Sequence, residues 1–291
     1  MIIVKLKGGL GNQLFQYVAG KRLALNRNVP LKLDISGYEE QPKTETPRKY
    51  ELGHLNIEAE IATDEEIKRL KYPHGIFSKY WGLTKQKIFK QFYIGYSPSI
   101  LKAPKDFYLE GYFKNEEYFK TIKEVVLKEI TLKEPLGLSG QAAKDEIERT
   151  ILPVSLHIRR GDYAQDSATA AYHGTLSIEY YRKAIAFLIE KIGPFQLFVF
   201  SDDINWAKEN LTFESPSQFP VHFISCEEIK NYEELFLMSL CKHNIIANSS
   251  FSWWAAWLNQ NSDKIVIAPK RWLAKTGNDY YKEIPQSWIK I

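Results

Sequence analysis

The chain has 291 residues, which is too long for one small core and fits two domains of roughly 100–150 residues each. Its composition is typical of a globular protein, and its net charge is +4. The Lys and Arg residues are scattered along the chain, which excludes a nucleic-acid-binding stripe. The small positive excess suits an anionic substrate or an anionic membrane surface. The two cysteines, Cys226 and Cys241, match neither a disulfide scaffold nor a zinc motif. No apolar run approaches the ~18 residues of a membrane span. We therefore expect a cytoplasmic protein that is soluble or peripheral at the inner membrane face.

The first half of the chain begins with a βαβ pattern. An apolar strand over residues 1–7, too short for a signal peptide, is followed by helical periodicity through Leu25 and by a strand over residues 29–33. This order predicts a parallel sheet. Residues 37–110 are irregular in pattern, and helical signals recur near residues 65–70 and 116–130. The Pro and Gly residues between positions 134 and 140 predict a linker.

The second half alternates strands and helices at regular spacing. We predict strands over residues 150–160, 196–201, 221–224, 244–248 and 265–268, and helices over residues 178–191, from about 204, 232–242 and 251–258. This alternation is typical of a doubly wound α/β domain. The chain is therefore expected to be α/β, with two Rossmann-like domains at residues 1–140 and 141–291 and the active site in a cleft between them.

The strand over residues 150–160 ends in a polar motif, His157-Ile158-Arg159-Arg160-Gly161-Asp162-Tyr163. Alternation along the strand puts His157 and Arg159 on one face and Arg160 on the apolar face. Ligands bind at the carboxyl ends of such strands, and the guanidinium fork of Arg159 pairs well with phosphate oxygens. The alternative is a buried ion pair between Asp162 and either arginine.

A second motif joins a strand to a helix in Asn248-Ser249-Ser250-Phe251-Ser252-Trp253-Trp254. A helix N-terminus offers free N–H groups and a positive dipole end to a phosphate, while Ser249 or Ser250 can also simply cap the helix. The tryptophans at positions 253, 254 and 257 have helical spacing and are expected in the core.

Other candidate segments carry weaker signals. The run Gly8-Gly9-Leu10-Gly11-Asn12-Gln13 is similar to a dinucleotide fingerprint, with Asp34 closing the next strand, but position 14 is Leu in place of the third Gly. Asp202 and Asp203 are adjacent, unlike the spaced pair that holds a divalent metal in many sugar-nucleotide transferases, and one of them can cap the next helix. Glu233 and Glu234 open a helix, where acids are favoured by the dipole or bind a ligand.

Together these three motifs resemble those of the bacterial α-1,2-fucosyltransferases, glycosyltransferase family 11. The resemblance is carried by the glycine-rich start, by residues 157–163 and by residues 241–254. It implies a GT-B fold, with the acceptor on the N-terminal domain and GDP-fucose on the C-terminal domain. It implies that Arg159 binds the β-phosphate and that His157 lies near the guanosine. The remaining donor-binding candidates are Arg160, Asp162, Asp202, Glu234, Ser249, Ser250 and Phe251.

The implied reaction moves L-fucose from GDP-β-L-fucose to the 2-hydroxyl of a galactoside with inversion. Glu234 stands where the family often has Asp, and its carboxylate is expected to pair with guanine. Asn12 is expected beside the transferred sugar, and Asp34 and Asp162 are the candidates for the general base. GDP-fucose is a co-substrate, and no metal or other cofactor is expected. The acceptor is a galactose-containing oligosaccharide or a lipid-linked glycan.

Three alternatives stay open at this point. The chain can be a nucleotide-sugar-binding protein without catalysis, a Rossmann enzyme that uses a dinucleotide or S-adenosylmethionine, or a fucosyltransferase of another linkage.

Overall fold

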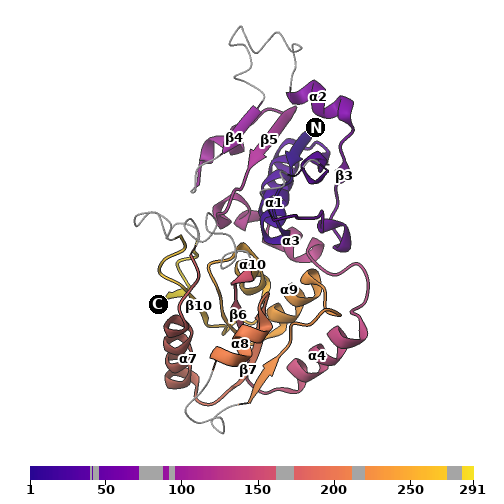
Figure 1. The fold of residues 1–291 in the computed structure, drawn as a ribbon. Helices are drawn as coiled ribbons and strands as arrows, with labels where there is room; N and C mark the ends of the chain where they lie inside the picture. The colour runs from indigo at the N-terminus through magenta and orange to yellow at the C-terminus, as the bar shows by residue number, and fades with distance from the viewer. Residues whose placement is uncertain are drawn as a thin grey trace. The chain divides into compact units, whose positions relative to one another are not determined.

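The computed structural model describes residues 1–39, 41, 46–71, 88–91, 96–161, 174–211, 220–273 and 284–291. They form two compact units, Met1–Lys133 and Glu134–Ile291 (Figure 1). The division precedes the boundary predicted after residue 140, because Leu138–Arg149 forms a single helix, α4, that packs against a helix of the second unit. Two glycines near the start of α4, Gly137 and Gly140, made this stretch look like a linker. The predicted α/β class is confirmed.

The N-terminal unit is built on a five-stranded parallel sheet in the order β3-β2-β1-β5-β4. Its strands are β1 (Ile2–Lys5), β2 (Leu31–Asp34), β3 (Glu60–Ile61), β4 (Ile88–Gln91) and β5 (Phe107–Gly111). Helix α1 (Leu10–Arg27) joins β1 to β2 as predicted, and α2 (Asp64–Lys71) follows β3. The sequence pattern did not indicate β3, β4 or β5. β3 has only two residues, both exposed, and β5 is buried on both faces, so neither shows an alternation.

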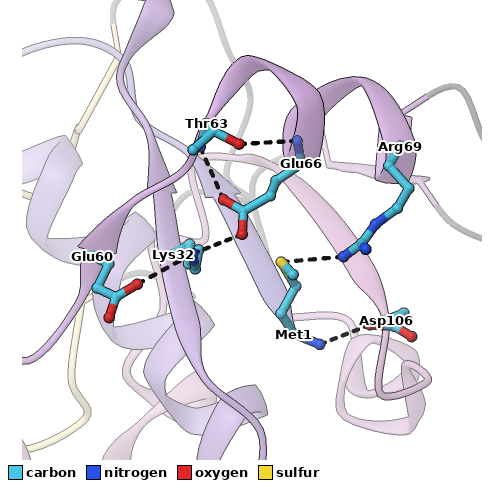
Figure 2. A network of polar contacts seen from close by, with 7 residues as sticks. All are labelled: Met1, Lys32, Glu60, Thr63, Glu66, Arg69 and Asp106. Atoms are coloured by element: carbon cyan, nitrogen blue, oxygen red, sulfur yellow. Dashed lines mark hydrogen bonds and ion pairs between the residues drawn. The ribbon is translucent and has the colours of Figure 1, made fainter.

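Short segments complete this unit. They are the 3-10 turns Ser36–Tyr38, Leu52–His54, Pro98–Lys102, Glu116–Tyr118 and Lys120–Ile122 and the helix α3 (Lys123–Glu129). The helix predicted over residues 116–130 is therefore three short pieces. Figure 2 shows how α2 is tied to the sheet: Lys32 Nζ on β2 lies 2.7 Å from Glu66 Oε1 and 3.1 Å from Glu60 Oε2. Thr63 and Glu66 bond each other's backbone N–H groups in the manner of a capping box, which fixes where α2 begins.

The C-terminal unit has a six-stranded parallel sheet in the order β11-β10-β9-β6-β7-β8. Its strands are β6 (Pro153–Ile158), β7 (Gln196–Ser201), β8 (Val221–Phe223), β9 (His243–Ile245), β10 (Val266–Ala268) and β11 (Ile289–Lys290). Besides α4, its helices are α7 (Ile178–Ile192), α8 (Ile204–Asn210), α9 (Asn231–Leu240) and α10 (Ser250–Leu258). Trp253, Trp254 and Trp257 of α10 are buried, which confirms the core prediction. Within the described ranges, no helix is long and apolar enough to cross a membrane.

Each sheet reverses its strand order at one point. In the C-terminal sheet, β6, β7 and β8 follow one another outward, and the chain then returns to place β9 on the other side of β6. In the N-terminal sheet, β1, β2 and β3 run outward, and β5 lies on the other side of β1. Such switch points, at the carboxyl ends of the strands, are where ligands bind in open parallel sheets.

Candidate active site

His157 lies near the end of β6, beside the switch point of the C-terminal sheet. It is 4% exposed, and its ring centroid lies 5.5 Å from that of Phe251 on α10, at an interplanar angle of 53°. Burial, together with the nearby charge of Arg159, lowers the pKa of His157 to about 3, so the imidazole is neutral near pH 7. Among the described residues, its Nδ1 has no hydrogen-bond partner. Because most buried polar atoms are hydrogen-bonded, this atom is a candidate contact for a ligand.

Arg159 follows β6 directly and pairs with an acid from the next strand of the sheet. Its Nη1 lies 2.8 Å from Oδ2 of Asp202, which follows β7. The other oxygen of Asp202 accepts a hydrogen bond from the backbone N–H of Arg160, also at 2.8 Å. One carboxylate thereby holds the chain where β6 ends and orients the Arg159 guanidinium. Asp162, the partner considered from the sequence, lies outside the described residues.

Gly161 permits this arrangement. A Cβ placed at this position would lie 2.5 Å from Asp202 Oδ2, closer than real Cβ contacts, and 3.0 Å from its Cγ, which is tighter than most real contacts. The glycine of the Arg-Arg-Gly motif therefore leaves room for the Asp202 carboxylate, which lies against its backbone. The sequence motif did not reveal this reason, since Asp202 is distant in the chain.

Arg160 has a different environment from Arg159. Its guanidinium carbon lies 3.9 Å from the centroid of the Trp206 ring on α8, and its Nε lies 3.8 Å from Asp203 Oδ2. Asp203 Oδ1 accepts the N–H of Trp206 at 3.2 Å, which confirms that one acid of the pair caps α8. The strand predicted to reach residue 160 ends at Ile158, so the two arginines diverge beyond it.

The N-terminus of α10 lies next to His157 through Phe251. Ser249 is the N-cap residue, and its side chain accepts the N–H of Phe251 at 3.3 Å, so the capping interpretation is confirmed. Ser250 opens the helix. The side-chain amide of Asn248 donates to the carbonyls of Gly174 and Trp272, which anchors the strand-to-helix turn. Because Phe251 lies in the first turn of α10, its contact with His157 brings the positive end of the helix dipole near this histidine.

Glu233 and Glu234 have separate roles although they are adjacent. Glu233 is buried, and its two oxygens accept the backbone N–H groups of Gly137 at 2.7 Å and Lys230 at 2.8 Å, which joins the starts of α4 and α9. Glu234 is half-buried and lies near Ser225 and Asp202. Burial raises the pKa of Glu234 to about 7; the charge of Asp202 acts in the same direction, and a hydrogen bond from Ser225 opposes it. Of the two glutamates, only Glu234 lies near Asp202, the acid that pairs with Arg159.

In the N-terminal unit, Asp34 is fully buried at the end of β2. Tyr108 Oη donates to its Oδ2 at 2.5 Å, and Ser36 donates to its Oδ1 from both Oγ and the backbone N–H, at 2.6 Å and 3.0 Å. Asn12 lies against Gly8, where a Cβ would lie 2.6 Å from Asn12 Nδ2; the φ of +79° at Gly8 is a second reason for glycine at this position. Asp34 and Asn12 are therefore both placed at the carboxyl edge of this sheet.

Two buried glutamines of α1 support the glycine-rich turn and were not singled out from the sequence. Gln13 donates to the carbonyls of Gly8 and Lys49 and accepts the N–H of Glu51. Gln16 accepts the N–H of Lys7 at 3.0 Å. Their signal was present, because uncharged polar residues on the buried face of a helix must find hydrogen-bond partners. Among the residues that the structure describes, no group of three His, Cys, Asp or Glu side chains is arranged to hold a metal ion.

Comparison with known proteins gives a consistent result. The family model described as Glycosyl transferase family 11 matches residues 79–291. An Escherichia coli O-antigen biosynthesis glycosyltransferase, WbnK, is 34% identical over 98% of this chain and 99% of its own length. An Escherichia coli α-1,2-colitosyltransferase is 33% identical over 100% of this chain and 99% of its own length. A human galactoside α-(1,2)-fucosyltransferase 1 is 26% identical over 55% of this chain and 45% of its own.

Among solved structures, the fucosyltransferase NodZ from Bradyrhizobium aligns over 87% of this chain and 91% of its own, with 13% identity and a TM-score of 0.48. The sequence matches decide against the alternative of a Rossmann enzyme that uses a dinucleotide or S-adenosylmethionine. Because the family model covers most of the chain and two relatives match it over nearly their full length, the protein belongs to glycosyltransferase family 11.

Proposed function

We propose that this glycosyltransferase moves L-fucose from GDP-β-L-fucose to the 2-hydroxyl of a galactoside, with inversion at the anomeric carbon. The acceptor is a galactose-containing oligosaccharide, free or lipid-linked, on the cytoplasmic side of the membrane. The observation that carries the proposal is the meeting of Arg159, neutral His157 and the α10 N-terminus at the switch point between β6 and β9. Relatives named for α-1,2 transfer, one of colitose and one acting on a galactoside, support this donor class and linkage.

The diphosphate would bind to Arg159 and to the first turn of α10. As the glycosidic bond breaks, negative charge grows on the β-phosphate, and a fixed guanidinium with a helix N-terminus stabilises it. Asp202 keeps Arg159 in place before the donor arrives, through the 2.8 Å contact. The remaining N–H groups of the guanidinium then face the leaving group without having to be ordered during the reaction.

The guanine would bind near Glu234. A carboxylate accepts from guanine N1–H and from the N2 amine together, a pattern that adenine lacks. The half-buried position of Glu234 beside Ser225 strengthens such a pair, because water competes weakly there. His157 and Phe251 together offer an aromatic and polar surface to the nucleoside.

Transfer is proposed to need no metal. The two adjacent acids near the donor site are already engaged, since Asp202 binds Arg159 and Asp203 caps α8. The positive charge that offsets the diphosphate then comes from Arg159 and α10. Asn12 and Asp34 are the proposed residues of the sugar side. Asp34 acts as a base only if Tyr108 or Ser36 gives up its hydrogen bond, and Asp162 is the other candidate.

The test is incubation of the protein with GDP-fucose and a panel of galactosides, followed by linkage analysis by NMR. We expect free GDP and an α-1,2-linked fucoside to appear together, with and without excess EDTA. GDP release that is independent of the acceptor, or a product of another linkage, contradicts the assignment. Loss of transfer in EDTA that manganese restores contradicts metal independence alone. A parallel reaction with GDP-colitose tests the second candidate donor, which the colitosyltransferase relative favours.

A further inference from the structure

Three neighbouring strands of the C-terminal sheet, β6, β7 and β8, each lead into a polar residue. β7 pairs in parallel with β6 on one side and with β8 on the other, so the three carboxyl ends lie along one edge. Arg159 follows β6, and Asp202 follows β7. Both belong to the proposed diphosphate site. Ser225 follows β8, one strand further along the same edge.

The hydroxyl oxygen of Ser225 is fixed by the backbone of β7. The N–H of Ser201, the last residue of β7, donates to Ser225 Oγ at 2.9 Å. The N–H of Ile224 donates to the Val199 carbonyl, also at 2.9 Å, and Ser201 Oγ accepts the N–H of Asp203 at 3.0 Å. These bonds tie the turn after β8 to the end of β7, and they set the position of the Ser225 oxygen.

The hydroxyl hydrogen of Ser225 is directed to Glu234 on α9. A serine hydroxyl has one hydrogen to donate and two lone pairs to accept with. The Ser201 N–H occupies a lone pair, and the Ser225 side chain is hydrogen-bonded to Glu234. An ionised carboxylate can only accept, so Ser225 is the donor of this charge-assisted bond. The carboxylate keeps further lone pairs for a ligand.

The other elements around α9 place one charged group near Glu234. It is Asp202, which is itself paired with Arg159 at 2.8 Å. Helix α10 and strand β7 also pack against α9, and neither contains an ionisable side chain. The carboxylate of Glu233, on α9 itself, accepts backbone N–H groups at the starts of α4 and α9. Helix α4 packs on α9 as well, and its buried residues are uncharged: Gly140, Ala143 and Ile147.

These surroundings give the Ser225 hydroxyl a specific effect on Glu234. Burial raises the pKa of Glu234 to about 7; the Ser225 hydrogen bond lowers it, and the charge of Asp202 raises it. A hydrogen bond to the charged form of an acid favours that form. Ser225 therefore opposes both burial and Asp202, and it favours the carboxylate that can accept from guanine.

We infer that Ser225 is a positioning residue for recognition of the nucleobase: its hydroxyl keeps the Glu234 carboxylate ionised and in place for guanine. The inference rests on the proposed function. A glutamate side chain loses rotamer freedom when it binds a ligand, and a carboxylate that is already anchored has less freedom to lose. Ser225 acts through Glu234 and takes no part in the transfer step.

The experiment compares Ser225→Ala, Ser225→Thr and Ser239→Ala with the wild type. Ser225→Thr keeps the hydroxyl. Ser239→Ala is the matched control, because it removes a hydroxyl from the same helix, where Ser239 Oγ donates to the Phe236 carbonyl at 2.6 Å. Calorimetric titration measures the Kd of GDP and of ADP across a pH series from about 6 to 9. NMR of protein with 13C-labelled glutamate follows the Glu234 carboxyl signal, which Glu234→Gln identifies.

We expect Ser225→Ala to raise the Kd of GDP about tenfold near pH 7, with the Kd of ADP unchanged. The titration midpoint of Glu234 should move to higher pH, because the hydrogen bond that favours the carboxylate is lost. The difference from wild type should therefore narrow as the pH rises, since Glu234 then ionises without Ser225. Ser225→Thr and Ser239→Ala should both behave as wild type. In a Glu234→Gln background, Ser225→Ala should change GDP affinity by less than about twofold.

A merely structural role for Ser225 gives a different result. It weakens GDP binding equally at every pH and leaves the Glu234 midpoint where it is, and that outcome overturns the inference. Unchanged GDP affinity in Ser225→Ala, an equal loss of ADP affinity, or an equal effect of Ser239→Ala also overturns it. If Ser225→Ala does not fold, Ser225→Cys replaces it. The thiol is a weaker donor, so the same shifts should appear at smaller size, and their absence contradicts the inference.

Failure of the proposed function is distinguishable from failure of this inference. If the wild type does not transfer fucose, the proposed function fails, while the pH series with GDP and the NMR titration still decide the role of Ser225. If the wild type transfers fucose but Glu234→Ala binds GDP normally, the proposed function stands and the inference is overturned.

Discussion

Lysine substitutions at the two adjacent arginines test the division of roles in the donor site. Arg159 is held by Asp202 at the end of the central strand, whereas the Arg160 guanidinium packs on the ring of Trp206. Lysine keeps the positive charge at either position but loses the planar fork of the guanidinium. We therefore expect Arg159→Lys to reduce catalysis and Arg160→Lys to reduce stability.

The expected magnitudes follow from the contacts. If Arg159 binds the leaving diphosphate as proposed, Arg159→Lys removes a fixed donor to it, so turnover should fall at least about 100-fold, or roughly 2.7 kcal/mol of transition-state stabilisation. Arg160→Lys weakens a cation–π contact worth about 0.5–1 kcal/mol at a partly exposed site. Its 3.8 Å contact with Asp203 reaches solvent and adds little. A loss of about 1 kcal/mol corresponds to a decrease of roughly 2–4 °C in Tm for a chain of this size.

The assay is turnover at saturating GDP-fucose and acceptor, with Tm measured for each variant by calorimetry. Trp206→Leu is the matched control: it removes the other side of the stacking contact and some packing on the core, so it should lower Tm at least as much as Arg160→Lys and leave turnover nearly intact. The double variant should be less destabilised than the sum of the two single variants, because they remove the same contact. Nearly normal turnover in Arg159→Lys, with inactive Arg160→Lys at unchanged Tm, would refute the reasoning.

Three further predictions concern the acids around this site. Glu233→Ala removes the charged acceptor of two partly buried backbone N–H groups and should lower the free energy of unfolding by about 1–3 kcal/mol with GDP affinity retained. Glu234→Ala should weaken GDP binding by about 2–3 kcal/mol with Tm retained, and calorimetric titration and melting separate the two effects. Burial, aided by the charge of Asp202, raises the pKa of Glu234 to about 7. GDP binding should therefore weaken by up to about tenfold for each pH unit below that value. A Glu234→Gln variant with the same pH dependence would count against the guanine assignment. Gly161→Ala places a Cβ 2.5 Å from Asp202 Oδ2 and should reduce turnover at least about tenfold by displacing Asp202 and Arg159. Unchanged kinetics would show that the close contact between residue 161 and Asp202 is unimportant for turnover.

Much of the fold follows from local sequence pattern. The alternation of strands and helices in the second half, the βαβ start and the buried tryptophans of α10 were predictable, because apolar periodicity and caps act over a few residues. The strands β3 and β5 were not, since a two-residue strand and a strand buried on both faces have no alternation to detect, and β4 was also missed. The helix α4 was missed because its glycines are typical of a loop; its start is held by Glu233, which lies far away in the chain.

The sequence by itself determined which residue types make up the proposed donor site, through its motifs at positions 157–163 and 248–254. Only the tertiary structure decided their partners: Asp202 for Arg159, Trp206 for Arg160, and separate roles for the neighbours Glu233 and Glu234. It also brought Lys7 and Tyr112 together at a second sheet edge. The physical reason is that each of these contacts joins groups far apart in the chain. Strand order, and not sequence spacing, sets which carboxyl ends are neighbours.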